Sequence, residues 1–197
     1  MTADGETLNV YRDQAEKYAK LVEDADQNPR LVDFIFAIPK GGRVLDLGCG
    51  PGHAAADMAT AGLRVDATDA VPEMVAMASS HDGVNAWLAS FDEIEGDQIY
   101  DGIWANFSLL HAPRSEMPRH LGALRKALKT GGRFHIGVKT GTGEERDDIG
   151  RLYTYYTETE LRDLLIQAGL TPGDSWAGNE PGLSGQLADW VVIAADG

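Results

Sequence analysis

The chain has 197 residues, which is enough for one domain with a substantial core and too few for two domains of ordinary size. Its 31 acidic residues against 17 basic ones give a net charge of -14, which argues against nucleic acid or an anionic membrane as partner because both are bound mainly through Lys and Arg. A single cysteine excludes an internal disulfide and a cysteine-based metal cluster.

The composition and the first residues of the chain indicate a cytoplasmic protein. Residues 1–6 lack the basic and apolar regions of an export signal, and no apolar run is long enough to span a bilayer. We therefore predict one cytoplasmic domain over residues 1–197. In this prediction residues 1–40 form a helical extension that covers the site, and residues 41–197 form a sheet core.

Two helices are predicted before the first strand. The first spans residues 8–22, because apolar residues recur three or four positions apart and share one helix face. The second begins after Asn28 with Pro29 in its first turn, a typical helix start, and ends near residue 39. Tyr11 and Tyr18 lie on the first helix, where either both fill the core or one of them lines the site.

The stretch from Gly42 to His53 reads as a strand, a tight turn and the start of a helix. A short apolar run that contains Asp46 is followed by glycines at positions 48, 50 and 52. Glycine has no side chain and tolerates positive φ, so such a turn brings backbone N–H groups and a helix N-terminus close to a ligand. A dinucleotide fingerprint, G-x-G-x-x-G, would need a third glycine where this chain has His53, so another ligand is favoured.

The string VLDLGCGPG in this stretch resembles the first motif of the class I S-adenosylmethionine-dependent methyltransferases. The resemblance implies that Asp46 and the turn residues Gly48, Cys49 and Gly50 hold the amino acid end of S-adenosyl-L-methionine. It also implies a Rossmann-like methyltransferase fold, with a seven-stranded sheet whose last strand is antiparallel. Independently, alternating strands and helices from Arg43 to Val138 predict an α/β fold with a doubly wound, mainly parallel sheet and helices on both faces.

A second acidic residue is predicted to bind the ribose of the cofactor. Residues 64–69 alternate like a strand that stops at Asp69, about twenty residues beyond the glycines, where nucleotide-binding α/β folds place a carboxylate for ribose hydroxyls. Ala70 and Met74, at the start of the next helix, are assigned to the same cofactor site. The alternative interpretation of Asp69 is a strand-end acid or a helix cap.

The ends of the third and fourth predicted strands complete the cofactor site. Methyltransferases of this class often carry Asp and a small residue after the third strand. Because this chain has Ser90 and Phe91 there, the adenine contacts are expected from the Ser90 hydroxyl and the Phe91 N–H, without a charge. Ser90 as a surface residue is the alternative. Asn106 and Phe107 follow the fourth strand at the carboxyl edge of the sheet, where ligands bind.

His111 is the first candidate for a catalytic base, because histidine titrates nearest neutrality. Similar enzymes often give a histidine here a packing role, which is the alternative. Tyr153 and Tyr155 are the second candidates; they follow a polar segment, residues 139–148, that is predicted to be a mobile loop. Their own segment, residues 151–156, is expected to be a substrate lid, a β-edge or a helix staple.

The remaining elements are predicted in chain order as strands at 84–88 and 99–105, a helix from Ser115 to the Gly131-Gly132 pair, a strand at 133–138, a helix that opens at Thr157 and ends at Gly169, and strands at 170–176 and 190–194. The Gly- and Pro-rich residues 178–185 are expected to join the last two strands as an antiparallel hairpin.

We therefore predict an S-adenosylmethionine-dependent methyltransferase that acts on a small molecule and needs no metal. Its reaction would be an in-line displacement at an activated sulfonium, to which the protein contributes chiefly alignment and exclusion of water. Two alternatives stay open: a non-catalytic protein that binds or senses the cofactor, and a nicotinamide-dependent oxidoreductase. No motif specifies the acceptor, the element methylated, the need for a base or the oligomeric state.

Overall fold

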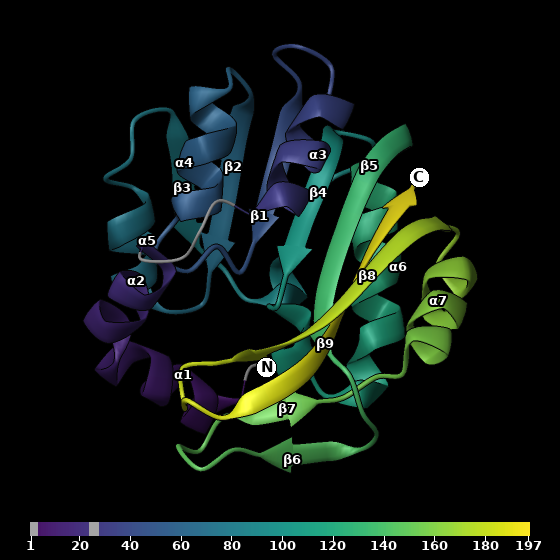
Figure 1. The fold of residues 1–197 in the computed structure, drawn as a ribbon. Coiled ribbons are helices and arrows are strands. Elements are labelled where there is room, and N and C mark those ends of the chain that lie inside the picture. The colour runs from purple at the N-terminus through teal and green to yellow at the C-terminus, as the bar shows by residue number, and fades with distance from the viewer. Residues whose placement is uncertain (1–3, 24–27) are drawn as a thin grey trace.

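The computed structural model describes residues 4–23 and 28–197, which form a seven-stranded sheet with helices on both faces (Figure 1). Across the sheet the strands are β3 (Val84–Leu88), β2 (Arg64–Asp69), β1 (Arg43–Leu47), β4 (Tyr100–Asn106), β5 (Leu128–Lys139), β9 (Leu187–Asp196) and β8 (Thr171–Pro181). β9 is antiparallel to both of its neighbours and all other pairs are parallel. The predicted fold class and the antiparallel last strand are confirmed.

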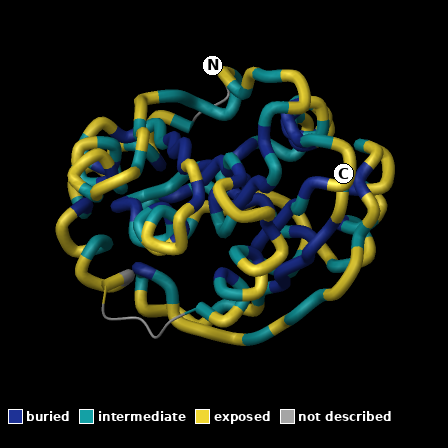
Figure 2. The backbone as a smooth tube through the Cα atoms, turned by 90° about the horizontal axis from the view of Figure 1, so that it is seen from above, coloured by how far each residue is buried: buried dark blue, intermediate teal, exposed yellow. Residues whose placement is uncertain are grey.

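Two groups of helices cover the two faces of this sheet, because each presents one apolar face to it. On one face, α3 (Pro29–Ala37) and α4 (His53–Thr60) pack on β1 and β2, and α5 (Pro72–Ala78) lies beside α4. On the other face, α6 (Met117–Ala127) and α7 (Glu158–Gln167) pack on β4, β5 and β9. Buried backbone is concentrated between these layers, as the view from above shows (Figure 2).

The N-terminal region contains two helices where one was predicted over residues 8–22. α1 (Gly5–Asp13) and α2 (Ala15–Glu23) are separated by Gln14, which leaves the helical conformation at φ -114° and ψ 17°. The break follows from packing on two different partners. Thr7 of α1 bonds to Leu152, whereas Ala15 at the start of α2 packs against Val71 and Met74 of the α5 region.

A small hairpin replaces the mobile loop predicted at residues 139–148. β6 (Glu144–Arg146) pairs in antiparallel fashion with β7 (Leu152–Thr154), outside the main sheet. The tyrosine segment is therefore a β-edge, one of the alternatives, and Tyr153 lies within it. In Figure 1 this hairpin lies beyond the carboxyl ends of β1 and β4, beside α1.

The boundaries of α6 also differ from the prediction. The helix starts at Met117 after a 3₁₀ turn, η3 (Arg114–Glu116), so its N-cap is Glu116 instead of Ser115. It ends at Ala127 and not at the Gly131-Gly132 pair, because Leu128 already pairs with Tyr100 of β4. Both final strands are longer than predicted, and they form the expected antiparallel hairpin.

Within residues 4–23 and 28–197, no helix combines the length and the apolar character that crossing a membrane requires.

Candidate functional site

The glycine turn after β1 is shaped by close contacts that only glycine permits. Gly48, Gly50 and Gly52 have φ of 69°, 53° and 88°, in the left-handed region. The N–H groups of Gly48 and Cys49 both donate to the Thr68 carbonyl, at 2.8 and 2.9 Å. A Cβ added to Gly48 would lie 2.4 Å from the Cβ of Ser108. The turn is thus pressed between β2 and the segment after β4.

Asp69, at the end of β2, binds the turn and faces the same space. Its Oδ2 accepts the Gly50 N–H and its Oδ1 accepts the Val71 N–H, each at 2.9 Å. Burial raises the pKa of Asp69 although both bonds act in the opposite direction. Each carboxylate oxygen has a second lone pair, so two hydroxyl donors, such as those of a ribose, can still bind.

Asp46 lies behind the turn as a buried carboxylate to which no described residue supplies a counter-ion. It is 3% exposed, and its Oδ2 has no hydrogen-bond partner among the described residues. Burial, and after it the charge of Asp69, raises the pKa of Asp46 to about 7. A buried acid of this kind is stabilised by a cation at the turn, which fits the ammonium group of an amino acid.

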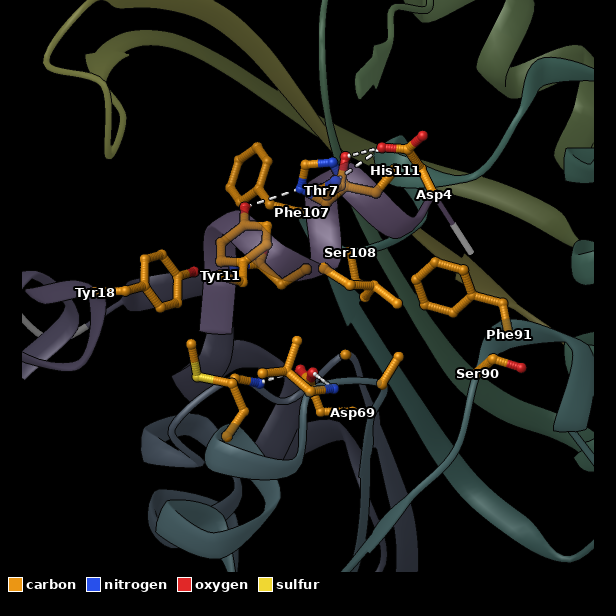
Figure 3. A pocket seen from close by; sticks show the side chains of 17 residues that line it. Asp4, Thr7, Tyr11, Tyr18, Asp69, Ser90, Phe91, Phe107, Ser108 and His111 are labelled. Atoms are coloured by element: carbon orange, nitrogen blue, oxygen red, sulfur yellow. Dashed lines mark hydrogen bonds between the residues drawn. The ribbon is translucent and has the colours of Figure 1, made fainter. Parts of the chain in front are cut away.

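The turn forms one wall of a cavity, open at its mouth, between the sheet and the two N-terminal helices (Figure 3). Figure 3 shows Asp69 on one side of the cavity and Tyr11 and His111 on the opposite side. The cavity is lined by Asp4, Thr7, Leu8, Tyr11, Tyr18, Gly48, Gly50, Asp69, Ala70, Val71, Met74, Ser90, Phe91, Asn106, Phe107, Ser108 and His111.

Most of the residues predicted for the site line the cavity, and four do not. The predicted residues on the wall are Tyr18, Gly48, Gly50, Asp69, Ala70, Met74, Ser90, Phe91, Asn106, Phe107 and His111. Asp46 lies behind the turn and Cys49 within it, and burial raises the pKa of the Cys49 thiol. Tyr153 and Tyr155 belong to the hairpin region and are not among the described residues that line this cavity. Tyr153 packs behind His111, at 4.7 Å between ring centroids.

The roof of the cavity is formed by α1, part of the extension over residues 1–40 that was expected to cover the site, but most of its lining residues were missed in the sequence. Asp4, Thr7 and Leu8 line the cavity, and Tyr11, weighed as an alternative to core packing, lines it beside Tyr18. α1 is held in place by Asp4, whose carboxylate accepts from the Arg146 guanidinium of β6 at 2.7 and 2.9 Å. The amphipathic spacing of α1 shows which face is buried but not that this face covers a cavity.

His111, in the 3₁₀ turn η2 (Leu109–His111), has both ring nitrogens engaged. Nδ1 lies 2.7 Å from the Leu152 carbonyl oxygen and Nε2 lies 2.9 Å from the Tyr11 hydroxyl. Because a carbonyl only accepts, Nδ1 carries the proton and Nε2 accepts the proton of Tyr11. Burial, followed by the positive charges of Arg151 and Lys139, lowers the pKa of His111 to about 4. The histidine is therefore neutral near pH 7, with the Tyr11 hydroxyl on its Nε2.

Phe107 has a strained backbone at the cavity wall. Its φ of 56° is unusual for a residue with a side chain, and such strain is concentrated at functional sites. Its N–H donates to the Gly137 carbonyl at 2.9 Å, and its ring meets Trp190 edge to face at 6.2 Å. These contacts hold the ring at the cavity wall, while the neighbouring Ser108 keeps a buried hydroxyl without a partner in the described residues.

Comparison with known proteins identifies the family that this fold and cavity define. Residues 15–172 match the model of a family described as a methyltransferase domain, so the chain belongs to that family. A ubiquinone biosynthesis O-methyltransferase of Xanthomonas axonopodis pv. citri is 29% identical over 154 residues, which cover 68% of this chain and 64% of that protein. The match thus spans less than two thirds of that relative.

Two further similar proteins are named with S-adenosylmethionine or with S-adenosylhomocysteine, the form left after methyl transfer. The crystal structure of Burkholderia thailandensis 1,6-didemethyltoxoflavin-N1-methyltransferase, with bound 1,6-didemethyltoxoflavin and S-adenosylhomocysteine, has a TM-score of 0.78 at 28% identity and covers 100% of this chain and 91% of that one. The S-adenosyl-L-methionine-dependent Diels-Alderase iccD of Talaromyces variabilis is 32% identical over 110 residues, 51% of this chain and 37% of that protein. The predicted methyltransferase class and its cofactor, S-adenosylmethionine, are confirmed.

The residues around the cavity fit this cofactor. The glycine turn leaves no room for a Cβ, the unpartnered Oδ2 of Asp46 suits the ammonium of the methionine end, and Asp69 has lone pairs for the ribose. At the adenine end, the N–H and O–H of Ser90 both donate to Glu93 Oε2, at 2.8 and 2.9 Å. The Ser90 oxygen also accepts from the Glu93 backbone N–H, which leaves it one lone pair to accept from the adenine amino group.

Ser90→Ala is expected to weaken binding of S-adenosylhomocysteine about three- to tenfold, the value of one hydrogen bond. The inosine analogue, which has a carbonyl in place of the amino group, should bind the variant and the parent equally. Isothermal titration calorimetry measures both affinities. Ser80→Ala, at a serine whose hydroxyl bonds to the Met77 carbonyl, is the control. Equal weakening for both ligands would rule out the Ser90 contact with the amino group.

Proposed function

We propose that this protein transfers the methyl group of S-adenosylmethionine to a small-molecule acceptor bound under α1. The observation that carries the proposal is a single cavity with two unlike sides. One side has the glycine turn and Asp69, which suit the cofactor, with the Tyr18 ring beside Gly50, and the other has the aromatic rings of Tyr11 and Phe107. Aromatic walls favour a planar, largely apolar acceptor. The toxoflavin methyltransferase and the ubiquinone O-methyltransferase, both similar in sequence, are named for small molecules of their own.

The cofactor supplies an electrophilic methyl group on a sulfonium, and this chain supplies alignment and a closed site. The turn and Asp69 would fix the cofactor from below, and residues 1–40, through α1 and α2, would cover it and exclude water. Where the acceptor carries a proton, Tyr11 is the group placed to receive it, with His111 behind it. We assign no base to Tyr153 or Tyr155.

Ligand-dependent stability distinguishes this function from a nicotinamide-dependent one. S-adenosylhomocysteine at 100 times its Kd should stabilise the protein by about 2.7 kcal/mol, which raises the Tm by about 5 to 10 °C for a chain of this size. NAD at the same concentration should leave the Tm unchanged. Differential scanning fluorimetry measures both shifts, and a shift with NAD alone would overturn the cofactor assignment for this chain.

Transfer itself is tested with labelled S-adenosylmethionine and a fractionated extract of cytoplasmic metabolites, the compartment predicted from the sequence. The proposal expects a labelled small molecule that is absent when Tyr11 and His111 are both replaced, by Phe and Ala. Binding of the cofactor without a labelled product in any fraction would favour the non-catalytic alternative.

A further inference from the structure

Arg151 is the largest of the fully buried side chains, and it lies just behind the roof of the cavity. Only 2% of its side chain is exposed. A buried guanidinium costs several kcal/mol unless its N–H groups are paired. Asp147 pairs with two of its nitrogens: Nε at 2.9 Å and Nη2 at 2.7 Å. The third nitrogen, Nη1, donates to the Tyr11 hydroxyl oxygen at 3.0 Å.

The hydrogen bonds that start at Arg151 run in one direction. A guanidinium can only donate, so the Tyr11 oxygen accepts from it. Since the Nδ1 proton of His111 is bound to the Leu152 carbonyl, Nε2 is the acceptor for the Tyr11 proton. Leu152 is the first residue of β7 and directly follows Arg151 in the chain. The Leu152 N–H donates to Thr7 Oγ1 of α1 at 2.8 Å. A closed ring of contacts therefore joins α1, η2 and β7.

We propose that Arg151 is a positioning residue for the acceptor side of the site: it fixes the Tyr11 oxygen, directs the Tyr11 proton to His111 and keeps His111 neutral in one tautomer. The arrangement stands independently of methyl transfer, while its use in catalysis rests on the function proposed above. Arg151 acts through Tyr11, because it is not itself among the described residues that line the cavity.

A purely structural role for Arg151 makes a different prediction for His111. If the guanidinium served only to pair the hairpin carboxylate, replacing it would remove its charge from the neighbourhood of His111 but leave the proton of the neutral ring on Nδ1 and the Tyr11 hydroxyl on Nε2. If it positions Tyr11, replacing it also removes the donor that fixes the Tyr11 oxygen, so the bond to Nε2 is lost and the neutral ring no longer keeps a single tautomer. The titratable groups that act on His111 are Tyr11 from α1, Lys139 from β5, and Asp147, Arg151 and Tyr153 from the hairpin.

The test is the protonation state of His111, followed by nitrogen-detected imidazole NMR on the full chain. In the parent protein the ring should be neutral from pH 5 to 8, with its proton on Nδ1 and a midpoint near pH 4. Arg151→Met should raise the midpoint by at least about one pH unit, a tenfold change in the protonation constant. Arg151→Lys, which restores the charge, should bring the midpoint back to within about half a unit.

Two further variants keep the test decisive. Arg146→Met breaks another ion pair between the hairpin and α1, that of Arg146 with Asp4 at 2.7 Å, and should leave the midpoint unchanged. If Arg151→Met does not fold, the double variant Asp147→Asn/Arg151→Met avoids an unpaired buried carboxylate. Its midpoint should still rise, because Arg151 acts on His111 more strongly than Asp147 does. A folded Arg151→Met variant, single or double, in which the neutral ring of His111 keeps its single Nδ1–H tautomer would overturn the proposal, whatever its midpoint.

The affinity for S-adenosylhomocysteine separates this proposal from the proposed function. It should change less than about twofold in Arg151→Met, since the residue contacts none of the groups assigned to the cofactor. A parent protein that fails to bind S-adenosylhomocysteine would overturn the proposed function and leave the NMR result to decide the role of Arg151.

Discussion

Gly48→Ala is expected to lower both the free energy of unfolding and the affinity for S-adenosylhomocysteine. The new methyl group would lie 2.4 Å from the Cβ of Ser108, which is fixed to the backbone and cannot rotate away. Alanine at a φ of 69° adds about 1 to 2 kcal/mol of backbone strain. Together with the steric contact we expect a loss of about 2 to 4 kcal/mol, measured by urea denaturation. Calorimetry should show at least about a hundredfold weaker binding, because the turn must move away from Ser108 and its N–H groups move with it.

Gly62→Ala separates the steric contact from the backbone strain. Gly62 has a φ of 87°, and no described atom lies within 4 Å of a Cβ added there. The variant should lose only the strain, about 1 kcal/mol, and bind S-adenosylhomocysteine as the parent does. If both glycine variants lose the same stability and neither loses affinity, the close approach of the turn to Ser108 has no functional meaning.

The floor of the cavity could be predicted from the sequence because its determinants are local. The turn needs glycines at fixed offsets, and Asp69 ends a strand that pairs with the turn, so a short string of residues specifies both. The mainly parallel sheet followed from the alternation of elements and the antiparallel last strand was implied by the family resemblance, and both are confirmed. Ser90 and Phe91 lie on the wall for the same reason, since they directly follow a strand of the same sheet edge.

A helical cover over residues 1–40 was expected from the sequence, but the residues that form the roof and their partners could not be predicted, because they depend on contacts between distant parts of the chain. Tyr11 meets His111 across 100 positions of sequence, and Asp4 meets Arg146 across 142. No local pattern encodes such pairs, and a tyrosine on an apolar helix face fits a core position equally well. Arg151 is the clearest case: arginine is almost never fully buried, so its sequence position gave no reason to place it behind the cavity.

Asp46→Asn is expected to stabilise the protein without cofactor and to weaken cofactor binding. The folded pKa of Asp46 is about 7, above the ordinary value of 3.8, so the folded state prefers the protonated acid. The stability that this preference gives is complete below pH 3.8 and is lost as the pH rises to about 7. Asparagine does not titrate. The free energy of unfolding of the variant should therefore exceed that of the parent by about 1 to 4 kcal/mol between pH 4 and pH 8. Urea denaturation at each pH measures this difference.

Asp66→Asn is the matched control, because Asp66 is equally buried but paired. Its Oδ2 accepts from Arg43 at 2.7 Å and its Oδ1 from Asn85 at 2.9 Å. Removing that charge should destabilise the protein at pH 8 by about 1 kcal/mol or more, the opposite sign to Asp46→Asn. Opposite signs at two buried aspartates of the same sheet would show that the cost lies in the missing partner and not in burial as such.

The ionisation of Asp46 is also expected to control the affinity for S-adenosylhomocysteine. An ionised Asp46 attracts the ammonium of the ligand, so the affinity of the parent should rise between pH 5 and pH 8 as the acid loses its proton. Asp46→Asn should bind at least about tenfold more weakly at pH 8, with only the pH dependence that Asp69 contributes. A variant that is more stable and binds as tightly as the parent would mean that the ammonium is held elsewhere and that the buried charge has another purpose.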